Sequence, residues 1–245
     1  MPRSIVRHPR IHPRRGRRRT LLVSATLGLA AGLGPRSTFA QAPGVPIAPS
    51  AFIRPGLAGA LNVGRGNEEY AALAAVAFGG GEGRWQIMGG VGGLTTAEGF
   101  RSPALTYGGR FGYRVFGRER LGVVAFAGLG GARLRTEERG DASDGTLTSR
   151  QLPLGVAAGY RGRWGEATSG RAWGVTLAPA WVQQSLRVSD EVSIDGSGVR
   201  ATAMAEVALS RRIGLSLAYE DGQRAKSGEP GPRGGVWGVA VALAR

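Results

Sequence analysis

Cysteine is absent from this sequence of 245 residues, and Lys226 is its only lysine. Without a thiol the chain can form no disulfide, no thiolate zinc site and no cysteine nucleophile. Histidine is nearly as scarce, because His8 and His12 are the only two. Thiol chemistry is therefore excluded, and histidine chemistry depends on whether the start of the chain is retained.

The sequence also lacks an apolar run long enough to cross a bilayer as a helix. Its modest apolar run, Thr20 to Leu33, follows a basic stretch and precedes small residues that end at Ala40. Such an order of basic segment, short apolar run and small residues is typical of a secretory signal peptide. We therefore expect residues 1–40 to be a signal peptide, cleaved between Ala40 and Gln41.

Removal of this segment takes away nine arginines and both histidines. It leaves 23 basic and 17 acidic residues, a net charge of +6 instead of +15, so we expect no nucleic-acid partner. Without histidine, a Ser-His-carboxylate triad is impossible, and we expect no enzymatic activity and no cofactor. The acidic loop Thr136 to Ser149 lacks the ligand pattern of a calcium-binding hand, and we expect no metal.

What the sequence does contain is alternation with a period of two. Between Leu105 and Phe116, an apolar phase alternates with a polar or small phase, as in a strand between two unlike environments. The apolar phase there holds Leu105, Tyr107, Phe111, Tyr113 and Val115, and the other phase holds Thr106, Gly108, Arg110, Gly112 and Arg114. Throughout the chain every tryptophan and tyrosine falls on the apolar phase.

About ten segments show this pattern after a proline-rich lead-in at residues 41–50. We expect strands at 55–63, 69–78, 85–95, 105–116, 121–135, 150–164, 171–187, 199–210, 213–220 and 235–245. Short connections alternate with long ones, which is typical of an antiparallel up-and-down transmembrane β-barrel occupying residues 51–245. Eight strands remain an alternative, because the connection Gly64 to Glu68 is short for an outer loop.

The positions of the aromatic residues favour a membrane. Tryptophan and tyrosine prefer the interfaces of a bilayer, and here they lie near the two ends of the strands. One belt is expected from Phe78, Trp85, Trp164 and Trp173, and the other from Tyr70, Tyr107, Trp181, Tyr219 and Trp237. A soluble periplasmic lipocalin-like carrier would reverse the two faces, but its exterior would be rich in lysine and glutamate.

The polar phase would then line the interior of the barrel. The candidate residues of this lumen are Arg110, Arg114, Arg161, Arg163, Arg200, Glu206 and Glu220. They indicate either a passage or site that favours anions, or a filling of ion pairs and water, and small barrels are usually filled by side chains. The strand at 121–135 is apolar on both phases, which suggests a bulge near Gly130 and Gly131.

Taken together, these features resemble the small outer-membrane β-barrel proteins of Gram-negative bacteria, the OmpA/OmpX-like group. The closing segment Gly235 to Arg245 is similar to the assembly signal of that group, although it ends in arginine rather than an aromatic residue. The resemblance implies outer-membrane lipid and the β-barrel assembly machinery as partners, and a monomer. The expected role is structural or surface interaction through the outer loops, with a narrow passive pore for small anionic solutes as the alternative.

Overall fold

The structure of the chain is a computed structural model. It describes residues 50–65, 70–95, 103–135, 146–165, 171–188, 192–221 and 235–244. The expected signal peptide, its Ala40–Gln41 cleavage site and residues 41–49 of the lead-in lie outside the described residues. So do Arg245 and most of the long connections.

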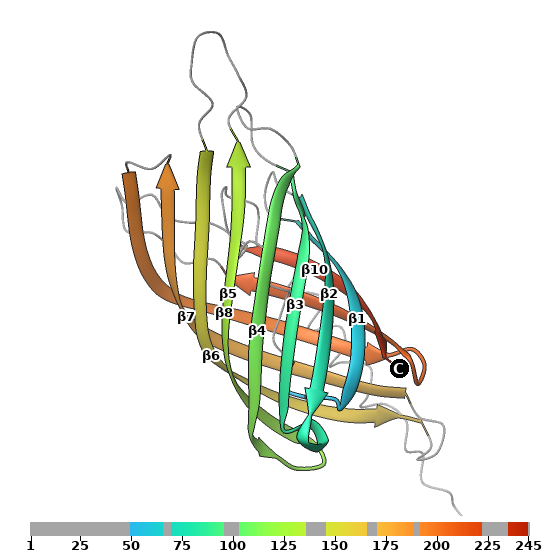
Figure 1. Cartoon of the computed structure of the whole chain (residues 1–245). Helices are drawn as coiled ribbons and strands as arrows, with labels where there is room; N and C mark the ends of the chain where they lie inside the picture. Colours follow the sequence, from blue (N-terminus) through green and yellow to red (C-terminus); the bar gives the residue numbers. More distant parts are fainter. Residues whose placement is uncertain are drawn as a thin grey trace, which may run out of the picture. The chain divides into compact units, whose positions relative to one another are not determined.

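Ten antiparallel strands form a closed barrel in which each strand pairs with its neighbours along the chain and β10 pairs with β1 (Figure 1). The strands are β1 Gly56–Arg65, β2 Tyr70–Gly80, β3 Trp85–Leu94, β4 Ala104–Gly117, β5 Leu121–Arg135, β6 Thr146–Trp164, β7 Arg171–Val188, β8 Val192–Ala208, β9 Ile213–Asp221 and β10 Val236–Ala244. One short 3-10 turn, Gly81–Gly83, joins β2 to β3. The ten-stranded up-and-down barrel is thus confirmed, and the eight-stranded alternative is wrong.

The connections define two ends of the barrel. The short-turn end carries residues 81–84, 118–120, 165–170 and 209–212, and the long-connection end carries the five other connections. Two strands begin earlier than expected, because β6 starts at Thr146 and β8 at Val192. Residues 192–198, expected in a long loop, instead continue the ladder with β7 from the pair Val188 and Val192 onward.

The expected bulge in β5 is not present. β5 keeps a single register with β6, and the irregularity lies in β4 between Arg114 and Phe116. β5 is apolar on both faces because Val124, Phe126 and Leu134 point into a packed interior while the alternate residues face outward. The inward residues of β5 are therefore apolar because they pack inside the barrel. The strand does not change which of its faces points outward.

The outward face of the barrel is apolar. Thirty-two large hydrophobic side chains of the described residues are exposed, among them Leu61 at 66% and Val199 at 67%. Every described tryptophan and tyrosine lies in phase with these residues. Among the described residues, no helix has the length and hydropathy needed to span a membrane.

Aromatic rings cover glycines on this outward face, near both ends of the barrel. A Cβ atom at Gly131 would lie 2.8 Å from the ring of Tyr107 on the neighbouring strand. One at Gly162 would lie 2.7 Å from the ring of Trp173. Trp85 covers Gly80 and Tyr219 covers Gly235 in the same way. Each of these four aromatic rings therefore lies over a glycine, which has no side chain to obstruct it.

Candidate functional site

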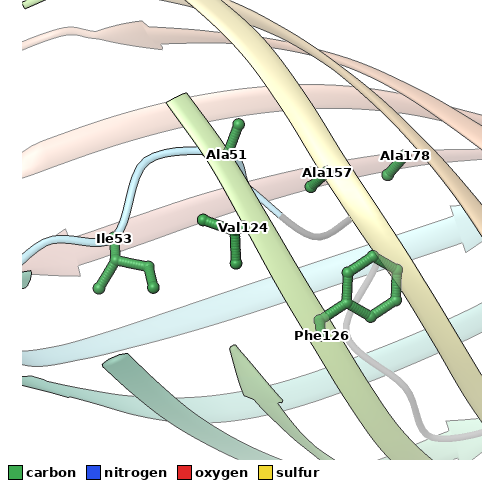
Figure 2. Packing of buried hydrophobic residues seen from close by; sticks show 6 residues of the cluster. All are labelled: Ala51, Ile53, Val124, Phe126, Ala157 and Ala178. Carbon is green, nitrogen blue, oxygen red and sulfur yellow. The ribbon is translucent and has the colours of Figure 1, made fainter. Parts of the chain in front are cut away.

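The barrel interior at the short-turn end is occupied by the chain itself. Residues Ser50–Pro55, here called the inner segment, run inside the barrel before β1 begins. Ala51 is 1% exposed and Ile53 is 8% exposed, and both belong to a cluster with side chains of β5, β6 and β7 (Figure 2). That cluster consists of Ala51, Ile53, Val124, Phe126, Ala157 and Ala178.

Glycines in the surrounding wall make room for the inner segment. A Cβ atom at Gly122 would collide with the Ala51 carbonyl oxygen and the Phe52 ring. A Cβ atom at Gly79 would collide with the Arg54 carbonyl oxygen, and one at Gly159 would lie 2.8 Å from the Ala51 side chain. These distances are too short for any side chain, so the backbone of the inner segment passes where the wall is bare.

Polar contacts also hold the inner segment. The Ala51 amide donates to the Thr176 hydroxyl at 3.4 Å. The Arg161 guanidinium lies 5.2 Å from the centre of the Phe52 ring, within the range of a cation–π contact. The same arginine donates from Nε to the Glu119 carbonyl oxygen at 2.8 Å, which ties it to the turn between β4 and β5. The inner segment is thus joined to the wall by packing, a hydrogen bond and a stacked cation.

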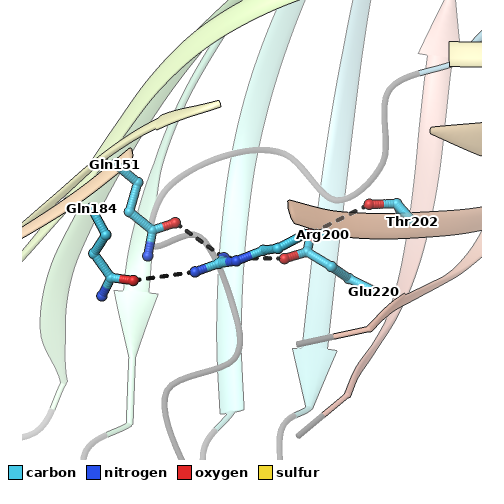
Figure 3. A network of polar contacts seen from close by, with 5 residues as sticks. All are labelled: Gln151, Gln184, Arg200, Thr202 and Glu220. Atoms are coloured by element: carbon cyan, nitrogen blue, oxygen red, sulfur yellow. Dashed lines mark hydrogen bonds and ion pairs between the residues drawn. The ribbon is translucent and has the colours of Figure 1, made fainter. Parts of the chain in front are cut away.

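A second feature, toward the long-connection end, is a polar network around Arg200 of β8 (Figure 3). Its Nη1 donates to Gln151 Oε1 at 3.2 Å and to Glu220 Oε1 at 3.3 Å, and its Nη2 donates to Gln184 Oε1 at 3.3 Å. Thr202 donates to the other Glu220 oxygen at 3.5 Å. Side chains from four strands, β6 to β9, therefore meet at one buried guanidinium.

The Arg200 network fills the interior of the barrel with buried side chains and does not form an open binding site for anions. The Arg200 side chain is 3% exposed, and Glu220 already supplies its counter-charge. Gln151 is 2% exposed, so the amide that also accepts from Arg200 is equally enclosed. The two terminal nitrogens of the guanidinium donate to a carboxylate and two amides, and the remaining nitrogen, Nε, is buried without a partner among the described residues. Enclosed in this way, the cation has little left with which to bind a solute anion.

Arg110 of β4 is a third buried group. It is 7% exposed, and its guanidinium lies 5.8 Å from the Phe126 ring. Its Nη2 lies 3.7 Å from the Met88 sulfur. Phe126 in turn belongs to the cluster that holds the inner segment, so Arg110 contacts that cluster through the Phe126 ring.

The structure divides the seven expected lumen residues among different places. It brings Arg200 of β8 and Glu220 of the adjacent strand β9 together. Glu206 lies at the short-turn end instead, near Arg54, Arg161 and Ser50.

The other expected lumen residues do not converge. Arg114 donates to the Glu82 carbonyl oxygen at 3.3 Å and so secures a turn. Arg163 is exposed near the end of β6. Sequence reasoning missed the inner segment and Gln184. The sequence signal that could have revealed the inner segment was the pair of apolar residues Ala51 and Ile53, together with glycines among the inward-facing residues of the strands.

A comparison of the sequence with models of known protein families finds no match, and a comparison with curated proteins finds none either.

Proposed function

We propose that the protein is an integral outer-membrane β-barrel with a filled interior, whose role is structural or exerted through the connections at its long-connection end. The observation that carries this proposal is the exposed apolar outward face. Leu61, Leu177 and Val199 are each more than half exposed, which would cost free energy in water but not in hydrocarbon. The role proposed is that of the small Gram-negative barrels which the sequence resembles.

The aromatic residues support the same placement. Trp164 and Trp173 stack with ring centres 6.0 Å apart near the short-turn end. Tyr219 and Trp237 lie 4.7 Å apart near the other end. Aromatic pairs at both ends of an apolar band are what the two interfaces of a bilayer favour.

The filled interior argues against the two alternative functions. A soluble carrier needs a hollow apolar interior, and here the inner segment occupies the interior at one end. A passive anion pore needs a continuous polar path. Here Arg200 donates to Glu220 and two glutamines of the barrel itself, so these polar groups bind one another and not a passing solute. A barrel closed by its own side chains and lead-in fits a structural or surface role better.

The proposal is tested by fractionation of the expressed full chain and by gel mobility. We expect the protein in the outer-membrane fraction, extractable only with detergent, with a faster band before boiling than after. Recovery from the periplasmic supernatant without detergent would contradict the proposal and favour the soluble carrier. In planar bilayers we expect no single-channel conductance from the purified protein, and steady conductance would favour the pore.

A further inference from the structure

We propose that an arginine patch on the outward face of β5, β6 and β7 binds the phosphorylated head group of a lipid in the leaflet at the long-connection end. The arginine patch consists of Arg133 and Arg135 on β5, Arg150 on β6 and Arg187 on β7, all of them exposed. This inference rests on the proposed function and adds a specific ligand to the membrane-facing surface.

The strand register brings three of these arginines around one hydroxyl. Arg133 is paired with Thr148 of β6, and Thr148 is paired with Arg187 of β7. Arg133 and Arg187 are thus two strand spacings apart, roughly 10 Å. Arg150 is two residues from Thr148 on the same face, roughly 7 Å along the strand. Long arginine side chains at these spacings reach a common phosphate group.

The arginine patch begins where the apolar face ends. Gly131, which the ring of Tyr107 covers, is paired with Arg150. Two residues toward the short-turn end, Leu129 and Leu152 are both more than half exposed. Because Tyr107 belongs to the aromatic belt at this end, the arginines lie at the level where lipid phosphates are expected.

Among the described residues, the charge on this part of the outward face is mainly positive. On the outward face of the described parts of β5 to β8, Asp195 is the one acidic residue. Asp195 is two strands from Arg150, because it is paired with Ser185 and Ser185 is paired with Arg150. It lies on the strand next to Arg187, two residues from Ser193, the direct partner of Arg187. Within those same described ranges the four arginines form no ion pair. Four acidic residues occur in the connection 136–145, outside the described residues.

Phosphate is the group that this chemistry selects. Arginine presents a planar fork of donors that binds phosphate oxygens in pairs, and it is less strongly hydrated than lysine. Thr148 adds a hydroxyl donor between Arg133 and Arg187, and Thr146 adds one beside Arg135. A lipid carrying phosphates on its head group provides that ligand at the required depth, whereas a neutral or zwitterionic lipid does not provide the charge.

The experiment titrates the purified full-length barrel in detergent with fluorescently labelled lipopolysaccharide, in phosphorylated and dephosphorylated forms. The triple variant R133Q/R150Q/R187Q is compared with R211Q/R212Q, which removes two exposed arginines from a turn at the short-turn end. We expect the apparent Kd to rise at least tenfold in the triple variant and to stay unchanged in the control. Dephosphorylation of the lipid should weaken wild-type binding by a similar factor. The apparent Kd of R133K/R150K/R187K should lie between those of the wild type and of R133Q/R150Q/R187Q.

Two results would overturn the inference. One is a triple variant that still shows heat-modifiable mobility and binds the phosphorylated lipid as wild type does. The other is loss of binding in R211Q/R212Q, which would move the lipid site to the short-turn end. Failure of the wild-type protein to fractionate with the outer membrane is a separate result, and it would remove the proposed function along with this inference.

Discussion

The ring of Tyr107 lies over Gly131 of the adjacent strand, with its outermost atoms 2.8 Å from the position that a Cβ atom would occupy. The two residues are directly paired in the ladder between β4 and β5. Glycine at this position lets a large interfacial ring lie flat on the sheet. Cross-strand contacts between aromatic residues and glycine also compensate for the weak intrinsic preference of glycine for strands.

Replacement of Gly131 by valine should therefore destabilise the barrel. The new side chain displaces the ring of Tyr107, and overpacking of this kind costs about 1–3 kcal/mol. The midpoint of urea unfolding in lipid vesicles, followed by tryptophan fluorescence, would measure the change. Gly196→Val on β8 is the matched control, because no atom lies within 4 Å of a Cβ atom there. Equal midpoints for the two variants would show that the Tyr107 contact is unimportant.

The inner segment should leave the lumen when the wall beside it is filled. At Gly122 the three atoms nearest to a Cβ position all belong to Ala51 and Phe52, so the side chain added by Gly122→Val meets the inner segment first. Because the chain has no cysteine, Ala51→Cys provides a single thiol for maleimide labelling. We expect slow labelling of Ala51→Cys by itself and labelling at least tenfold faster when it is combined with Gly122→Val.

Ser210→Cys, in an exposed turn, gives the reference rate for a freely accessible thiol. Fast labelling of Ala51→Cys in the otherwise unchanged barrel would mean that the inner segment is not held inside. Unchanged slow labelling with Gly122→Val, in a barrel that remains heat-modifiable, would mean that the wall tolerates the added side chain. Neither result is expected from the contacts around Ala51.

The Arg200–Glu220 pair should show strong coupling in a double-mutant cycle. Removing one partner of a buried pair leaves an uncompensated charge and costs about 3–5 kcal/mol. Glu220 is 21% exposed, so Glu220→Gln should fall at or below the lower end of that range, and Arg200→Met should cost more. The double variant should be less destabilised than the sum of the two, as measured by urea unfolding. Simple additivity would contradict a direct ion pair.

The sequence predicted the strands well because each has one apolar and one polar phase, and the ends of most strands are marked by glycine and charged residues. The pairing of Arg200 with Glu220 was within reach of sequence reasoning because their strands are adjacent. Gln184 was not, because its distance from Arg200 depends on the register of a long hairpin. The inner segment was missed because a glycine such as Gly122 is equally consistent with a bend or with close strand packing.

The assignment of the outward face to hydrocarbon can be tested with one arginine at two depths. Leu177 is 57% exposed in the middle of β7, and Gln183 lies on the same face of the same strand beyond Trp181. An arginine on the lipid face near the bilayer midplane costs about 2–4 kcal/mol, and one near the interface costs about 0–1 kcal/mol. Leu177→Arg should therefore lower the stability of the vesicle-inserted barrel strongly and Gln183→Arg hardly at all. In a water-soluble barrel both substitutions would replace an exposed side chain by a solvated one, so similar unfolding free energies for the two variants would contradict the membrane placement.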